Sequence, residues 1–172
     1  MASSNATASG IAHTCSSQDA CEGCLANSNL AAELTNSQIG ALFKVARTRR
    51  LSRGEVLITE GDNGGPLFVV AKGQLEVARI HTGESTVPLG HLGPGMLVGQ
   101  LTFFDDGKRT ATVTAAADGT CVLAIERSDV EAMLHDDPLL VYRIMRAILR
   151  SAAATIDNMN KVFADSVHYI QS

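Results

Sequence analysis

Residues 54–79 read GEVLITEGDNGGPLFVVAKGQLEVAR, and this stretch contains the pattern that decides the fold. Its short runs rich in Val, Ile, Leu and Phe are separated by a glycine-rich turn at 61–65 and by Gly73. Short strands joined by tight turns, with no long helix between them, are typical of antiparallel sheets. Similar runs continue to residue 126, and they read STVPLGHL, MLVG, TATVTAA and TCVLAIE. We therefore expect about seven or eight strands in a jelly-roll-like antiparallel β-roll.

The distribution of glycine divides the chain. Twelve of the 15 glycines lie between Gly54 and Gly119, and none lies between Thr120 and Ser172. Because glycine favours turns and is unfavourable inside helices, the region after residue 126 is predicted to be helical. The fold class is therefore mainly β with flanking helices. We expect a Cys-containing N-terminal tail (1–29), a β-roll with short flanking helices (30–135) and a long C-terminal helix (136–172).

The C-terminal helix is predicted to be unusually long. Ser128 is a good N-cap for a short helix, and Pro138 suits the first turn of the next one. No Gly or Pro follows up to Ile170, so about 30 residues could form a helix about 45–50 Å long. Apolar or small residues recur along this helix in alternating steps of three and four and form a stripe. Its members are Met145, Ile148, Ala152, Thr155, Met159 and Val162, and Ile144, Leu149 and Ile156 widen it.

Two explanations of this stripe remain open. A helix that long extends beyond a domain of this size, so its far half needs a partner, and we favour a homodimer through the helix. The alternative is that the helix folds back on its own roll.

Composition excludes several classes of protein. The chain has 14 Lys and Arg against 18 Asp and Glu, a net charge of −4, which argues against sequence-independent binding of nucleic acid. It has no run of 18 apolar residues, and its start, MASSNATASGIA, lacks the features of a signal peptide. We therefore expect a cytoplasmic protein with no membrane contact. The histidines are scattered, with no catalytic grouping, so we expect no enzyme.

Residues 97–115, LVGQLTFFDDGKRTATVTA, hold the candidate binding chemistry. Gly99 allows a ligand close to the backbone, and the N–H groups near Leu101 and Thr102 would face outward at the start of a helical turn. Arg109 supplies a charged fork for phosphate oxygens, and Gln100 offers a donor and an acceptor for a sugar hydroxyl. The alternative is an ordinary turn of the roll with a surface arginine.

The wider pattern resembles the cyclic nucleotide-binding domain over roughly residues 38–165. The resemblance rests on 54–79, then LGPGMLVGQL, RTATVTA and CVLAIERSDVEAML. It implies a β-roll, a phosphate-binding cassette of the form Phe-Gly-Glu-Leu-Ala…Arg-x-Ala-x-Val-x-Ala, a short helix and a long C-terminal helix. It also implies that Arg109 holds the cyclic phosphate and that Leu101 and Thr102 help through their backbone.

The cassette departs from the family pattern at three positions. Gln100 replaces the Glu that contacts the ribose 2′-hydroxyl, but it keeps an acceptor, and the eukaryotic exchange-factor branch has the same Gly-Gln-Leu and still responds to cyclic AMP. Thr102 replaces an Ala, and Val98 replaces a Phe. The change at Gln100 leaves an alternative open, in which the roll has lost its ligand and serves as an interaction scaffold.

The resemblance also suggests residues for the base. Thr110, just after the arginine, could hydrogen-bond a purine, which is compatible with cyclic AMP and often favours cyclic GMP; we place cyclic AMP ahead. Thr155 falls where the bacterial catabolite activators have a threonine that touches adenine. The alternative for Thr155 is a hydroxyl that bonds its own helix backbone.

Four cysteines support a different function, a redox or oxygen sensor. Cys15, Cys21 and Cys24 lie in the tail and Cys121 on a late strand, an arrangement that could hold an iron–sulfur cluster or zinc. It resembles that of the oxygen-sensing fumarate and nitrate reduction regulators, with the spacing reversed. Those sensors generally lack the cassette arginine that this chain keeps. The alternative is a flexible tail and a Cys121 that is a small buried residue.

Taken together, these patterns predict a regulatory module that binds a cyclic nucleotide. Relatives that regulate transcription continue into a helix-turn-helix domain, whereas this chain stops at Ser172. We therefore expect a stand-alone sensor without direct DNA binding, which signals through its C-terminal helix to a separate protein.

Overall fold

The computed structural model describes residues 23–80, 86–105 and 107–170, with the backbone alone for 162, 163 and 165–170. The helical elements are η1 (Ala31–Glu33), α2 (Asn36–Val45), η2 (Gln100–Thr102), α3 (Arg127–Ala132) and α4 (Pro138–Ile170). The strands are β1 (Arg47–Leu51), β2 (Val56–Ile58), β3 (Leu67–Lys72), β4 (Leu75–Ile80), β5 (Thr86–Leu92), β6 (Leu97–Val98), β7 (Thr112–Ala115) and β8 (Thr120–Ile125).

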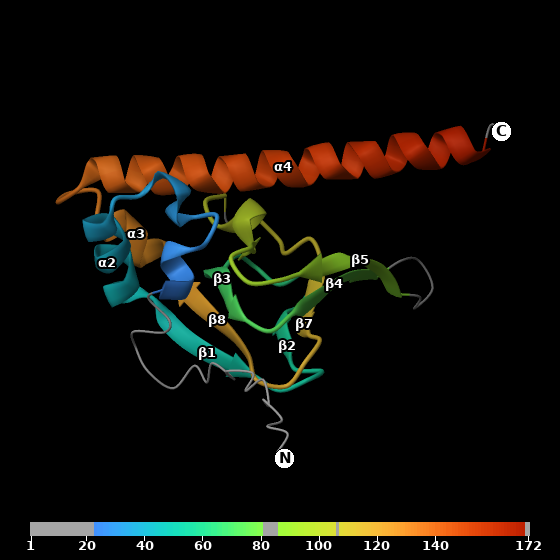
Figure 1. Cartoon of the computed structure of the whole chain (residues 1–172), viewed down its shortest axis with the longest axis horizontal. Coiled ribbons are helices and arrows are strands. Elements are labelled where there is room, and N and C mark those ends of the chain that lie inside the picture. The colour runs from blue at the N-terminus through green and yellow to red at the C-terminus, as the bar shows by residue number, and fades with distance from the viewer. Residues whose placement is uncertain (1–22, 81–85, 106, 171–172) are drawn as a thin grey trace, which may run out of the picture.

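The strands form two four-stranded sheets, in the orders β1-β8-β3-β6 and β2-β7-β4-β5. Neighbouring strands pair antiparallel in both sheets. The helices lie together on one side of the roll (Figure 1). The predicted fold class, an antiparallel β-roll with a short helix and a long C-terminal helix, is confirmed.

One strand was not expected from the sequence. β1 reads RTRRL, with four exposed residues before the buried Leu51, so it lacks the apolar alternation that indicates a strand. The strand forms through backbone pairing with β8 from Arg47 to Leu51, and it lies at the edge of its sheet. Charged side chains are typical of such an edge strand.

The core consists of two apolar layers that share β8. Cys121, Leu123 and Ile125 face the layer between the first sheet and the helices, whereas Val122 faces the layer between the two sheets. This double burial explains why TCVLAI reads as a continuous apolar run, since successive side chains of a strand point to opposite faces.

The N-terminal segment joins the helix-side layer. Leu25 and Leu30 are fully buried there, and the backbone N–H of Asn29 donates to the carbonyl of Gly95 at 2.9 Å. The predicted tail (1–29) therefore packs against the roll from residue 23 onward, while 1–22 lie outside the described residues.

Helix α4 begins at a well-defined cap. The Asp137 carboxylate accepts the N–H of Leu140 at 2.9 Å and the amide N–H of Gln38, on α2, at 3.1 Å. The hydrogen bond from Leu140, then that from Gln38, holds the pKa of Asp137 below its usual value. These contacts fix the start of α4 against α2.

The two halves of α4 have different surroundings. Leu140, Ile144 and Ile148 are buried against the roll in the first half, whereas the second half continues beyond it (Figure 1). No helix among the described residues is long and apolar enough to cross a membrane.

The predicted apolar stripe of α4 combines two faces. Ile144 and Ile148 turn toward the roll and belong to the helix-side apolar layer. A second stripe is exposed and follows steps of three and four from Tyr142; its large members are Tyr142, Met145, Leu149, Ile156 and Met159. The side chain of Val162 is outside the described residues, and the homodimer stays a prediction.

Candidate functional site

The cassette lies where β6 ends near α4. Gly99 has left-handed dihedral angles, φ 80° and ψ 15°, and it starts η2. A loop then leads to Arg109, whose backbone N–H donates to the carbonyl of Asp62 at 2.8 Å. The backbone N–H of Gly61 donates in turn to the Arg109 carbonyl at 2.9 Å. The glycine-rich turn at 61–65 therefore fixes the chain at Arg109.

The Arg109 side chain is folded into the protein. It is only 5% exposed, and its Nη1 donates to the Gly99 carbonyl and to the Thr102 hydroxyl, both at 3.0 Å. Its Nη2 donates to the Pro66 carbonyl at 2.8 Å. The expectation of a surface arginine at an ordinary turn is therefore wrong.

Two glycines make room for this guanidinium. A Cβ on Gly99 would collide with Nη1, and a Cβ on Gly65 would lie 2.9 Å from Nη2. Both glycines also have positive φ, which other residues rarely adopt. Gly99 was predicted as a binding residue for close approach to a ligand, and in the structure it is Arg109 that approaches it.

The electrostatics of Arg109 are unusual. Burial lowers the pKa of its guanidinium, and the Asp62 carboxylate opposes that shift, but arginine stays cationic at neutral pH. The oxygens that Arg109 contacts among the described residues are all neutral. Because a buried charge is costly unless it is paired, this cation is suited to an anionic ligand.

Gln100 lies between the cassette and α4. Its Nε2 donates to the Thr155 hydroxyl at 3.4 Å, and its Oε1 is buried with no hydrogen-bond partner among the residues that the structure describes. Buried acceptors are nearly always satisfied, so this oxygen needs a donor. An incoming hydroxyl could supply it.

The Thr155 hydroxyl takes part in two hydrogen bonds. It donates to the Ser151 carbonyl at 3.0 Å, the backbone bond that the alternative expected. It also accepts from Gln100, which places it opposite the cassette.

The structure thus connects most of the predicted binding residues. Hydrogen bonds link Gly99, Thr102 and Arg109, and a separate bond links Gln100 to Thr155. Leu101 and Thr110 lie beside them in the chain, with exposed side chains. The prediction missed Pro66 and Gly65, although the Gly-Gly-Pro sequence in the glycine-rich turn was a visible sign of an unusual backbone there.

The cysteine hypothesis gains no support. Cys121 is buried and Cys24 is half-buried against the same apolar layer, while Cys15 and Cys21 lie outside the described residues. Within the ranges that the structure describes, no three or more His, Cys, Asp or Glu side chains gather to hold a metal ion.

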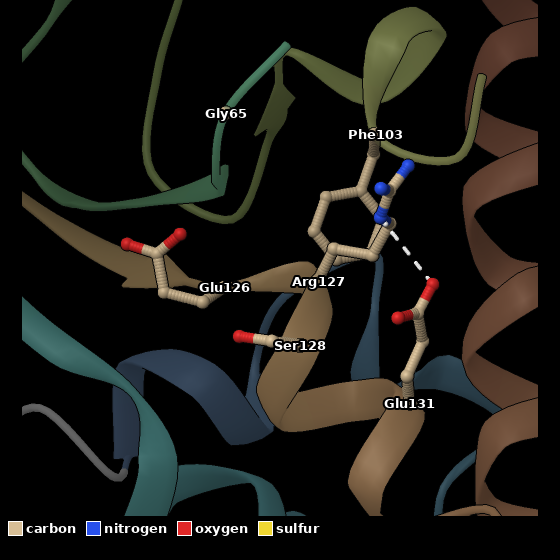
Figure 2. A pocket seen from close by; sticks show the side chains of 6 residues that line it. All are labelled: Gly65, Phe103, Glu126, Arg127, Ser128 and Glu131. Atoms are coloured by element: carbon tan, nitrogen blue, oxygen red, sulfur yellow. Dashed lines mark ion pairs between the residues drawn. The ribbon is translucent and has the colours of Figure 1, made fainter. Parts of the chain in front are cut away.

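A separate cavity of about 250 Å³ lies between the cassette and α3 (Figure 2). Its lining includes Glu126, Ser128 and the ion pair of Arg127 with Glu131, whose N and O atoms are 3.3 Å apart. Its carboxylates already pair with arginines, Glu131 with Arg127 and Glu126 with Arg47 at 3.7 Å, so the cavity is a poor site for the phosphate of a nucleotide.

The family of the chain follows from comparison with known proteins. Residues 48–137 match the cyclic nucleotide-binding domain family, and this match spans more than half of the chain. The chain belongs to this family.

Individual relatives agree with that assignment. The cyclic AMP receptor protein of Thermus thermophilus is 30% identical over 117 residues, which cover 68% of this chain and 54% of the relative. The N-terminal domain of a transcriptional regulator from Streptomyces coelicolor has a similar structure, with a TM-score of 0.68 and 33% identity, covering 79% of this chain and 94% of that domain.

A more distant structure supports the fold alone. A cyclic nucleotide-binding domain from Methylobacillus flagellatus has a TM-score of 0.76 at 18% identity, over 87% of this chain and 83% of that one. The chain spans little more than half the length of the first curated relatives it matches.

Substitution of Gly99 by alanine should cost more stability than the backbone strain alone. Gly54→Ala is the matched control, because Gly54 has φ 82° against 80° for Gly99 and open space around its Cβ position. We expect about 1–2 kcal/mol from left-handed strain in Gly54→Ala. Gly99→Ala should lose clearly more in denaturant unfolding because Arg109 must move. Equal losses would contradict the placement of Arg109 over Gly99.

Proposed function

We propose that this domain binds a cyclic nucleotide, cyclic AMP in preference to cyclic GMP, and acts as a regulatory module rather than an enzyme. The observation that carries the proposal is the buried Arg109 cation, whose hydrogen-bond acceptors among the described residues are all neutral oxygens. The buried Gln100 Oε1 in the same cassette, which has no partner within the described part of the chain, supports it.

The phosphate is assigned to Arg109. Its Nε–H and one N–H of Nη2 have no acceptor among the described residues, which leaves two donors for phosphate oxygens. Charge-assisted bonds of this kind are about twice as strong as neutral ones. The backbone N–H groups of Leu101 and Thr102 complete the phosphate site in the family pattern.

The ribose is assigned to Gln100. Its buried Oε1 can accept the proton of the 2′-hydroxyl, which removes the cost of an unsatisfied acceptor. Because Gln carries no charge, it also avoids the repulsion that a carboxylate would exert on the nearby phosphate.

The base is assigned to the space near Thr110 and α4. Thr155 lies opposite the cassette, where it can contact a purine once Gln100 turns to the ribose. Cyclic AMP is favoured by the likeness to a receptor named for cyclic AMP.

The output is assigned to α4. The bond from Gln100 to Thr155 links the cassette directly to this helix. A ligand that hydrogen-bonds to Gln100 changes this contact. The ligand shifts the helix only if it binds the protein more tightly in one helix position than in the other. We infer that α4 transmits this shift to a separate protein in the cytoplasm, without direct contact to DNA or a membrane.

The exposed stripe of α4 is assigned to a homodimer. Met145 is 48% exposed, Leu149 70% and Ile156 55%, and their spacing matches the seam of a two-stranded coiled coil. A second copy of the same helix would cover these side chains.

Arg109→Ala should abolish the binding of both cyclic nucleotides. Removing one partner of a buried, hydrogen-bonded charge pair costs about 2–5 kcal/mol, so Kd should rise at least about 30-fold. Isothermal titration calorimetry measures this. Lys108→Ala is the matched control, because the neighbouring Lys108 is exposed, and it should stay near the wild-type Kd.

Two results would contradict this assignment. Unchanged binding by Arg109→Ala would place the phosphate elsewhere. A wild-type chain that binds neither nucleotide would favour the interaction scaffold.

Gln100→Ala should remove the preference of the domain for a nucleotide that carries the ribose 2′-hydroxyl. Wild-type protein should bind 2′-deoxy cyclic AMP about 2- to 10-fold more weakly than cyclic AMP, the range of one neutral hydrogen bond. Gln100→Ala should bind the two ligands equally in a competition assay. A variant that still discriminates would exclude Gln100 as the ribose contact.

Leu149→Glu should convert a dimer into a monomer, because it places two charges in the seam between the helices. Sedimentation velocity measures the change. Ala154→Glu is the control, because Ala154 is exposed on the opposite side of α4 by helical position, and it should remain dimeric. A monomeric wild type, or a dimeric Leu149→Glu, would refute this interface.

A further inference from the structure

The side chain of Thr102 has a contact that the cassette pattern did not predict. The residue is only 5% exposed, and its hydroxyl oxygen accepts from Arg109 Nη1 at 3.0 Å. An alanine at this position, as in the family pattern, could make no such bond. The threonine therefore adds a hydrogen bond to the arginine that the proposed function assigns to the phosphate.

The donors of Arg109 are divided between two ends of the guanidinium. Both N–H groups of Nη1 have acceptors, one in the Gly99 carbonyl and one in the Thr102 hydroxyl. Nη2 uses one N–H on the Pro66 carbonyl. Within the described ranges, the donors left without an acceptor are the second N–H of Nη2 and the single N–H of Nε, which together suffice to bind two phosphate oxygens.

We propose that the Thr102 hydroxyl is a positioning group for phosphate binding. With the Gly99 carbonyl, it holds the Nη1 end of Arg109 and so keeps Nε and Nη2 available to the ligand. This inference rests on the proposed function, because it assumes that Arg109 binds the phosphate. It assigns to the Thr102 side chain a role that the cassette pattern gives only to its backbone.

The alternative is that the hydroxyl competes with the ligand for Arg109. Competition requires the phosphate to take the Nη1 donors, yet two other donors stay available without breaking any bond in the structure. Turning Nη1 toward a ligand would also move it away from the Gly99 carbonyl, to which it donates at 3.0 Å. Positioning needs no such movement.

The side chain of threonine suits this role. Its β-branch restricts the first side-chain torsion, so the hydroxyl keeps one direction at little entropic cost. Serine would keep the hydroxyl with more freedom. Valine would keep the shape and remove the oxygen, which leaves one buried N–H of Arg109 without an acceptor.

Calorimetric titration of the full chain with cyclic AMP and with cyclic GMP tests the proposal. Thr102→Val should raise the Kd for cyclic AMP about 10-fold, the size expected for a hydrogen bond to a charged group. It should raise the Kd for cyclic GMP by the same factor, because both ligands share the phosphate. Thr102→Ser should restore affinity to within about 3-fold of wild type, which a purely steric role would not predict.

Thr112→Val is the matched control. Thr112 also lies near Arg109 in the chain and accepts a hydrogen bond at its hydroxyl, from the N–H of Glu60 at 3.1 Å. Loss of the Thr112 hydroxyl should leave the Kd values for cyclic AMP and cyclic GMP near those of the wild type. If Thr102→Val does not fold, Thr102→Ala removes the same oxygen with less bulk, and the same loss is expected.

The outcomes separate this inference from the proposed function. Wild-type protein that binds neither nucleotide would refute the proposed function itself. Normal binding by Thr102→Val or Thr102→Ala, with binding lost in Arg109→Ala, would refute only the role of the hydroxyl. Tighter binding by the hydroxyl-free variants would overturn positioning and establish competition.

Discussion

The buried guanidinium of Arg109 is the group on which the cassette depends. It is held by two backbone carbonyls and one hydroxyl, all of them neutral, in a space that side chains on Gly65 or Gly99 would fill. A cation in such surroundings costs folding free energy until an anion joins it. The surroundings of Arg109 are therefore suited to a negatively charged ligand.

The cassette is also connected to the rest of the molecule. Gln100 reaches Thr155 on α4, and Glu33 on η1 forms ion pairs with Arg146 and Arg150 of the same helix. The position of α4 is thus coupled to both the binding residues and the N-terminal segment. A helix with one half fixed on the roll and the other half extending beyond it can convert a small local change into a larger displacement at its end.

Much of this architecture could be predicted from the sequence. Short apolar runs between glycine-rich turns predicted the β-roll, and the absence of Gly and Pro after Pro138 predicted α4. The strand β1 could not be predicted, because an edge strand with exposed arginines lacks apolar alternation. The two faces of α4 could not be separated either, since apolar spacing alone does not distinguish side chains that pack on the roll from those that stay exposed.

The residues of the candidate site were selected from the sequence, but their arrangement was not predicted. Spacing and family resemblance selected Arg109 and Gln100, but the burial of the arginine and its bond to Thr102 depend on contacts with distant residues such as Pro66. The most direct test of the central claim is a crystal structure of the chain with cyclic AMP. The phosphate should lie within hydrogen-bond distance of Arg109. A nucleotide bound away from Arg109, or a cassette left empty at saturating ligand, would contradict the account.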